Sequence, residues 1–116
     1  MEDDRLSIAL NEAGYRYTLN NQRMLNQMRL RARLGFSVNG GTFSVTPELI
    51  AFVHAMVANG SEELVLCDIN ENPIRINDSK VFLEDLIDVY TQAHNEYLAN
   101  QTELRKARST EAVVGV

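Results

Sequence analysis

The residues best placed to do chemistry lie in a short polar segment, where Asp68, Asn70 and Asn72 alternate with other residues. This D-x-N-x-N spacing is the one with which calcium-binding loops begin. However, Pro73 stands where such a loop needs glycine, and Ser79 stands where it needs a bidentate glutamate. No helix pattern precedes the segment either. We therefore predict a turn in which Asp and Asn side chains bond their own backbone, with no metal site and no cofactor.

Three other side chains are candidates for catalysis or metal binding. Cys67 falls in an apolar strand pattern, which favours a small buried hydrophobe over a reactive thiol. His54 falls in a predicted helix, where we expect a partly exposed residue, and His94 falls in another. Because these residues form neither a Ser-His-acid or Cys-His set nor a zinc spacing, the sequence predicts no catalytic residues and no enzyme.

The glycine-rich segment Asn39-Gly40-Gly41 raises the question of phosphate binding, but the spacing and the lysine of a Walker loop are absent. Alternating residues flank the segment, and an Asn-Gly or Gly-Gly turn joins hairpin strands readily. We therefore predict a hairpin over residues 36–45, with the turn at either 39–40 or 40–41. Both registers place Phe36, Val38, Phe43 and Val45 on one face.

The elements around these segments predict an α+β fold in the order α-ββ-α-ββ-α. Long helices are expected over residues 3–34 and 79–108, bracketing a compact core over residues 35–78 in a single domain, 1–116. Thr46 and Pro47 open a helix that we expect to be largely buried. Residues 64–67 and 73–76 form a second hairpin, which is expected to join the first in one antiparallel sheet. A tail, 109–116, follows.

Both long helices carry seams with alternating spacings of four and three residues, which is typical of helices that pack along their length. A break near Gly14 in the first helix remains an alternative. The first seam comprises Leu6, Leu10, Ala13, Tyr17, Asn20, Met24 and Gln27 or Met28. The second comprises Leu83, Ile87, Tyr90, His94, Tyr97, Gln101, Leu104 and Arg108, broadened by Phe82, Leu86 and Ala93. We expect its second half to meet a partner.

Charge is unevenly distributed along this chain of 116 residues, whose formal net charge is −5. Residues 13–45 hold five arginines and no acidic residue, whereas residues 46–104 hold eleven acidic residues against two basic ones. Such asymmetry suits pairing between like subunits, although contacts within one chain would serve equally. The acidic balance makes nucleic acid an unlikely partner, and the basic stretch from Arg23 to Arg33 is the only region that favours one.

Composition restricts the class of protein further. An apolar content of 45% and a charged content of 23% are ordinary for a globular domain. No apolar run approaches the ~20 residues that cross a bilayer. The N-terminus, which is acidic, does not resemble a secretory signal, and a single cysteine fits a reducing compartment. We therefore expect a cytoplasmic location and no membrane partner.

Three features of the chain are its asparagine-rich acidic composition, the segment from Asp68 to Ile76 that leads into a long helix, and the ending from Leu104 to Ser109. In these features it resembles small virion or assembly proteins of tailed bacteriophages. The resemblance implies a non-enzymatic part used in many copies, located in the host cell cytoplasm or in a virion. The resulting hypothesis is a structural or assembly protein that oligomerises through its long helices, with other proteins of an assembly as further partners. A small regulatory nucleic-acid binder and an adaptor or inhibitor of one host protein are the alternatives. The predicted interface residues are Arg23, Met24, Met28, Arg29, Arg31, Arg33, Tyr90, His94, Tyr97, Gln101, Leu104 and Arg108.

Overall fold

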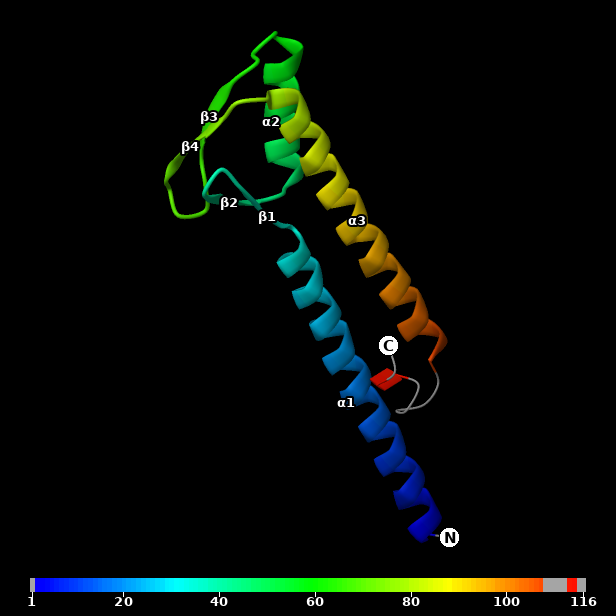
Figure 1. Ribbon diagram of the computed structural model, residues 1–116. Coiled ribbons are helices and arrows are strands. Elements are labelled where there is room, and N and C mark those ends of the chain that lie inside the picture. The colour runs from blue at the N-terminus through cyan, green and yellow to red at the C-terminus, as the bar shows by residue number, and fades with distance from the viewer. Residues whose placement is uncertain (1, 108–112, 115–116) are drawn as a thin grey trace. The chain divides into compact units, whose positions relative to one another are not determined.

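A computed structural model describes residues 2–107 and 113–114 (Figure 1). It contains three helices and two antiparallel hairpins in the predicted order, and it is mostly helical (68%), so the α+β prediction is confirmed. The chain divides into two compact units. The central unit comprises residues 31–95, and the helical unit comprises residues 1–30 together with 96–116. The central unit therefore includes the first half of the last helix together with residues 35–78.

The first hairpin, in the central unit, pairs β1 (Gly35–Val38) with β2 (Gly41–Ser44). Its turn is Asn39-Gly40, with φ values of 51° and 83°, which decides between the two predicted turns. Both positions need positive φ, which asparagine tolerates and glycine adopts without strain. Phe36 pairs directly with Phe43, so the predicted apolar face is confirmed.

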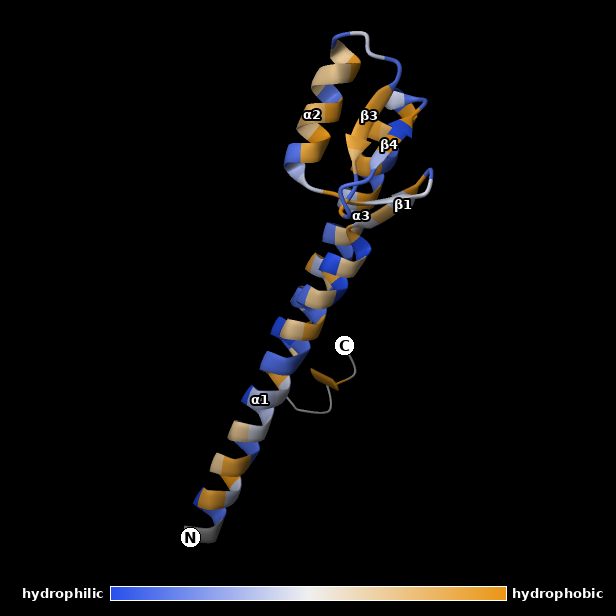
Figure 2. Cartoon of the chain, turned by 90° about the vertical axis from the view of Figure 1, so that its left-hand side faces the viewer, coloured by the Kyte–Doolittle hydropathy of each residue, from blue (hydrophilic) through white to orange (hydrophobic). Residues whose placement is uncertain are grey.

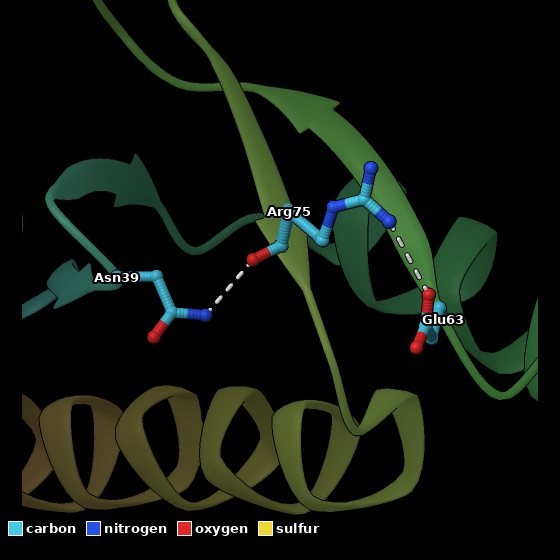
Figure 3. Close-up of polar contacts among 3 residues, drawn as sticks. All are labelled: Asn39, Glu63 and Arg75. Carbon is cyan, nitrogen blue, oxygen red and sulfur yellow. Dashed lines mark hydrogen bonds and ion pairs between the residues drawn. The ribbon is translucent and has the colours of Figure 1, made fainter.

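The second hairpin pairs β3 (Leu64–Cys67) with β4 (Pro73–Ile76), at the predicted boundaries. The two hairpins form separate two-stranded sheets, so the expectation of one antiparallel sheet is wrong. Individual hydrogen bonds connect them instead. The Asn39 side chain donates to the Arg75 carbonyl oxygen at 2.9 Å (Figure 3), and the Ile69 amide donates to the Thr42 carbonyl oxygen at 2.9 Å.

Helix α2 (Pro47–Ala58) begins where Thr46 and Pro47 predict it. The Thr46 hydroxyl oxygen accepts from the Leu49 amide at 3.1 Å, satisfying one of the unpaired donors at the start of the helix. Val53 is its one fully buried residue, and Phe52 is 49% exposed. The prediction of a largely buried helix is therefore wrong. Two small hairpins and one neighbouring helix cover only part of the α2 surface.

The core of the central unit joins both hairpins, α2 and the first half of α3 (Ser79–Lys106). Phe43 and Phe82 meet edge to face, with ring centroids 5.5 Å apart. Helix α3 begins where expected, because an Asp78 carboxylate oxygen accepts from the Val81 amide at 3.2 Å. The buried members of this core are Phe43, Val45, Val53, Leu64, Ile74, Ile76, Phe82 and Leu86.

The helical unit pairs part of α1 (Glu2–Arg33) with the second half of α3. Helix α1 runs through Gly14 without the break that the sequence left open. The Tyr15 hydroxyl donates to the Ala107 carbonyl oxygen at 2.7 Å, and the Asn26 amide donates to the Tyr97 carbonyl oxygen at 3.3 Å. Because the later α1 residue meets the earlier α3 residue, the two segments are antiparallel. Within the described residues, no helix is long and apolar enough to span a membrane.

Candidate functional site

The polar turn after β3 is structural. One carboxylate oxygen of Asp68 accepts from the amides of Asn70 and Asn72, both at 2.9 Å, and the other accepts from the Thr42 amide at 3.1 Å. The bond from Asn72, with those from Thr42 and Asn70, holds the pKa of this carboxyl below its ordinary value, although burial acts in the opposite direction. Both oxygens accept from backbone amides, so the predicted side-chain-to-backbone turn is confirmed for Asp68, whereas Asn70 and Asn72 contribute their backbone amides.

Cys67, His54 and His94, the remaining candidates for chemistry, do not form a metal site in the described part of the chain. Residues 2–107 and 113–114 contain no group of three His, Cys, Asp or Glu side chains able to hold a metal ion. Cys67 is exposed, which corrects the prediction of a buried hydrophobe. Alternation along β3 buries Leu64 and turns Cys67 outward, because this short strand has a covered face and an open one. His94 stacks on Tyr90, with ring centroids 4.0 Å apart, and His54 is exposed.

The most distinctive surface lies on α1, which has two different sides within the helical unit. One side packs on α3 through Tyr15, Leu19 and Asn26. The opposite side carries the apolar seam that the sequence predicts, and it is exposed. Figure 2 shows hydrophobic residues recurring along α1. We call this side the outer stripe; it comprises Leu6 (60% exposed), Leu10 (63%), Ala13, Tyr17 (70%), Met24 (61%) and Met28 (60%).

The seam predicted on α3 is half correct. Leu86, Ala93 and Leu104 are buried and Tyr90 and Tyr97 are half-buried, as the broadened seam predicts. Ile87 is exposed instead, and Ala107, which the prediction did not include, is buried. The periodicity indicated a seam on α3. Because small and polar residues flank it, the sequence did not determine which of two adjacent rows is buried. Leu104 is only 1% exposed and packs against Tyr15 and Leu19 of the same chain, so its predicted contact with a partner is corrected.

The other predicted interface residues are spread over several surfaces. Met24 and Met28 belong to the outer stripe, whereas His94, Tyr97 and Gln101 are half-buried on α3. Gln101 donates to the Tyr97 hydroxyl oxygen at 3.0 Å, so these two side chains hold each other in place. Arg108 lies outside the described residues.

The arginines of α1 are all exposed, but they form no single track. Arg23, Arg29 and Arg31 point to different sides of the helix, because successive residues are rotated by ~100°. Arg33 is exposed near the end of the helix. Arginines distributed in this way are better placed for separate contacts with protein groups than for binding along one continuous phosphate backbone.

A second apolar surface lies in the central unit, between α2 and α3. It is an open groove of about 470 Å³, lined mainly by Ile50, Ala51, Ile87 and Tyr90, with His54 at its side. Ile87, which the sequence places in the seam, is 42% exposed here.

Comparison with known proteins found no protein-family model, curated sequence or solved structure that matches the chain.

Proposed function

We propose that this chain is a non-enzymatic assembly protein that binds a second copy of itself through the outer stripe of α1. The exposure of the stripe is the observation that carries the proposal. Its side chains recur over residues 6–28, about 34 Å of helix at 1.5 Å per residue. An apolar row of this length on a helix that already packs on its other side is typical of a protein-binding surface.

The stability of the helical unit does not require the stripe. The contacts that hold α1 to α3 come from the side of α1 that carries Tyr15, Leu19 and Asn26. Large apolar side chains on the opposite side add nothing to this packing. Burying each of them against a partner would contribute on the order of 1 kcal/mol, because each is already partly covered. The stripe thus supplies favourable energy for association at no cost to the internal contacts.

A second copy of the chain is the partner that the charges favour. Residues 13–45 are purely basic and residues 46–104 are strongly acidic, so each copy offers surfaces of both signs to its neighbour. Arg29 and Arg31 are exposed toward the end of α1, and Asp4 and Glu12 are exposed toward its start. Exposed ion pairs contribute only about 0–1 kcal/mol each, so their role would be orientation.

The resemblance to small virion and assembly proteins of tailed bacteriophages supports this proposal. A part used in many copies requires surfaces that bind like subunits, and the host cytoplasm or a virion is where such parts are used. Other proteins of the same assembly would then occupy further surfaces, such as the groove between α2 and α3. The alternative of an adaptor or inhibitor of one host protein would use the same outer stripe for a different partner.

The test is light scattering coupled to size-exclusion chromatography at micromolar concentration. The wild-type chain is expected to form a defined oligomer, and the double variant Leu10→Asp/Met24→Asp is expected to be monomeric with unchanged helix content by circular dichroism. Leu98→Asp is the matched control, because Leu98 is 59% exposed on α3 and lies outside the stripe. A monomeric wild-type protein contradicts the proposal, as does equal dissociation by the control.

A further inference from the structure

From the pattern of the outer stripe we infer that two copies pair antiparallel, with a twofold axis passing near Tyr17. This inference rests on the proposed function and specifies the geometry of the same surface. It makes the interface isologous, so that each copy contributes the same residues and the pairing closes at two subunits.

The first argument is the symmetry of the stripe about Tyr17. Leu6 and Met28 lie eleven residues before and after it, and Leu10 and Met24 lie seven residues before and after it. When one helix is turned end to end, large apolar residues therefore fall opposite large apolar residues at both ends. Ala13 lies between the central tyrosine and Leu10, and its small side chain leaves room for the ring of the partner's tyrosine.

The second argument is the charge along α1. Its first twelve residues hold four acidic residues and Arg5, whereas residues 13–33 hold five arginines and no acidic residue. A parallel pair would place the basic halves together, which is unfavourable, whereas an antiparallel pair places each basic half beside an acidic half. Arg16 approaches its own copy near the axis, where the two Tyr17 rings can accept guanidinium groups on their faces.

Orientation can be measured with single-cysteine variants made in a Cys67→Ser background, which removes the native exposed thiol. Leu10→Cys and Met24→Cys are prepared separately and then mixed to allow subunit exchange. A short bismaleimide reagent is added to each protein alone and to the mixture. The antiparallel arrangement predicts little cross-linked dimer in either protein alone and abundant dimer in the mixture, because residue 10 faces the region of residue 24.

Tyr17→Cys is the positive control, since a residue near the axis cross-links with its own copy. Efficient cross-linking of Leu10→Cys alone would overturn the inference, because like residues meet only in a parallel pair. A dimer by light scattering in which neither Tyr17→Cys nor the mixture cross-links would overturn both the orientation and the choice of surface. A monomeric Cys67→Ser protein would instead overturn the proposed function, so the two failures are distinguishable.

Discussion

At the scale of single residues, Gly41 shows how closely the two hairpins approach. A Cβ atom at this position would lie 2.5 Å from Cγ1 and 2.8 Å from Cδ1 of Ile74, and 3.3 Å from Cβ of Asp68. Ile74 belongs to the core and has little room to move, since it is only 9% exposed. Because Gly41 of β2 has no side chain, the second hairpin can pack directly against the first at this position.

Gly41→Ala is accordingly expected to lower the free energy of unfolding by about 1–3 kcal/mol through overpacking. Gly14→Ala is the control, because a Cβ there would meet nothing within 4 Å and alanine favours a helix interior by roughly 0.5–1 kcal/mol. Chemical denaturation of both variants measures the difference. If both substitutions changed the free energy of unfolding in the same direction, the close approach at Gly41 would be contradicted.

The carboxylate of Asp68 makes the stability of the fold depend on pH in the acidic range. Its pKa is held below the ordinary value of 3.8, so its contribution to stability is fully present above that value. The contribution is lost as the pH falls through the lowered pKa, because protonation weakens acceptance from the amides. Asp68→Asn is expected to lower the midpoint of thermal unfolding at neutral pH, and the difference from wild type should shrink toward pH ~3. Asp88→Asn, an exposed change on α3, serves as the control. If the difference in midpoint between Asp68→Asn and wild type stayed constant with pH, the role of the Asp68 carboxylate would be contradicted.

At the scale of elements, the helical unit contains a polar pair, a buried Asn26 and a half-buried Asn100, where an apolar contact would be expected. Asn26 is 2% exposed, and its side-chain oxygen accepts from the Asn100 amide at 3.1 Å while its own amide donates to Tyr97. Both asparagines are satisfied only when the two helices stand in one register. A buried amide pair of this kind specifies register at a cost in stability.

Asn26→Leu alone is expected to destabilise the chain by about 1–2 kcal/mol, since it leaves the Asn100 amide without its acceptor. The double change Asn26→Leu/Asn100→Leu is expected to recover that loss, because both polar groups are then removed together. A double-mutant cycle by thermal unfolding measures the coupling, and Asn11→Leu on the exposed surface of α1 controls for helix propensity. Additive effects of the two changes would show that the pair is not coupled.

The elements that could be predicted from the sequence are those determined by local signals. Asn39-Gly40 forms its turn because few residue pairs adopt positive φ, and Thr46 begins α2 through its own hydroxyl. Which face of a helix is buried depends instead on distant residues. Helix α1 offers an apolar row through Leu10 and Tyr17 and a mixed row through Tyr15 and Asn26, and contact with α3 selects the second. The seam of the candidate surface was thus predicted, with Met24 and Met28 as interface residues, but the row of α1 that packs on α3 was not.

The corrections concerning Cys67 and α2 have the same physical origin. Hydrophobicity predicts that a residue tends to be buried, but burial also requires a neighbouring layer. Each hairpin has two strands and one covered face, so the side chains of Val65 and Cys67 alternate outward despite their apolar character. Likewise, Phe52 of α2 has no layer over it. The number of layers is a property of the tertiary fold, which periodicity alone does not give.

At the scale of the whole molecule, its charge pattern decides between a protein partner and a nucleic acid. The net charge of −5 repels a polyanion, and the arginines of α1 point to different sides. We therefore expect no binding to duplex or single-stranded DNA by fluorescence anisotropy at micromolar protein and physiological salt. Arg29→Glu/Arg31→Glu is instead expected to weaken self-association by up to about tenfold. Micromolar DNA binding that this double variant abolishes would establish the nucleic-acid alternative.

The Asn39-Gly40 turn also limits how long the purified protein keeps its native form. Asparagine followed by glycine undergoes deamidation faster than most sequences, because the unhindered glycine nitrogen attacks the side-chain carbonyl, expels ammonia and closes a cyclic imide. Water then opens this ring to aspartate or isoaspartate. At Asn39 the nitrogen that donates to the second hairpin is thereby lost, and a carboxylate faces the Arg75 carbonyl oxygen. Chemical ageing of one turn would therefore loosen the connection between the hairpins, so stored samples become mixtures whose stability declines with age.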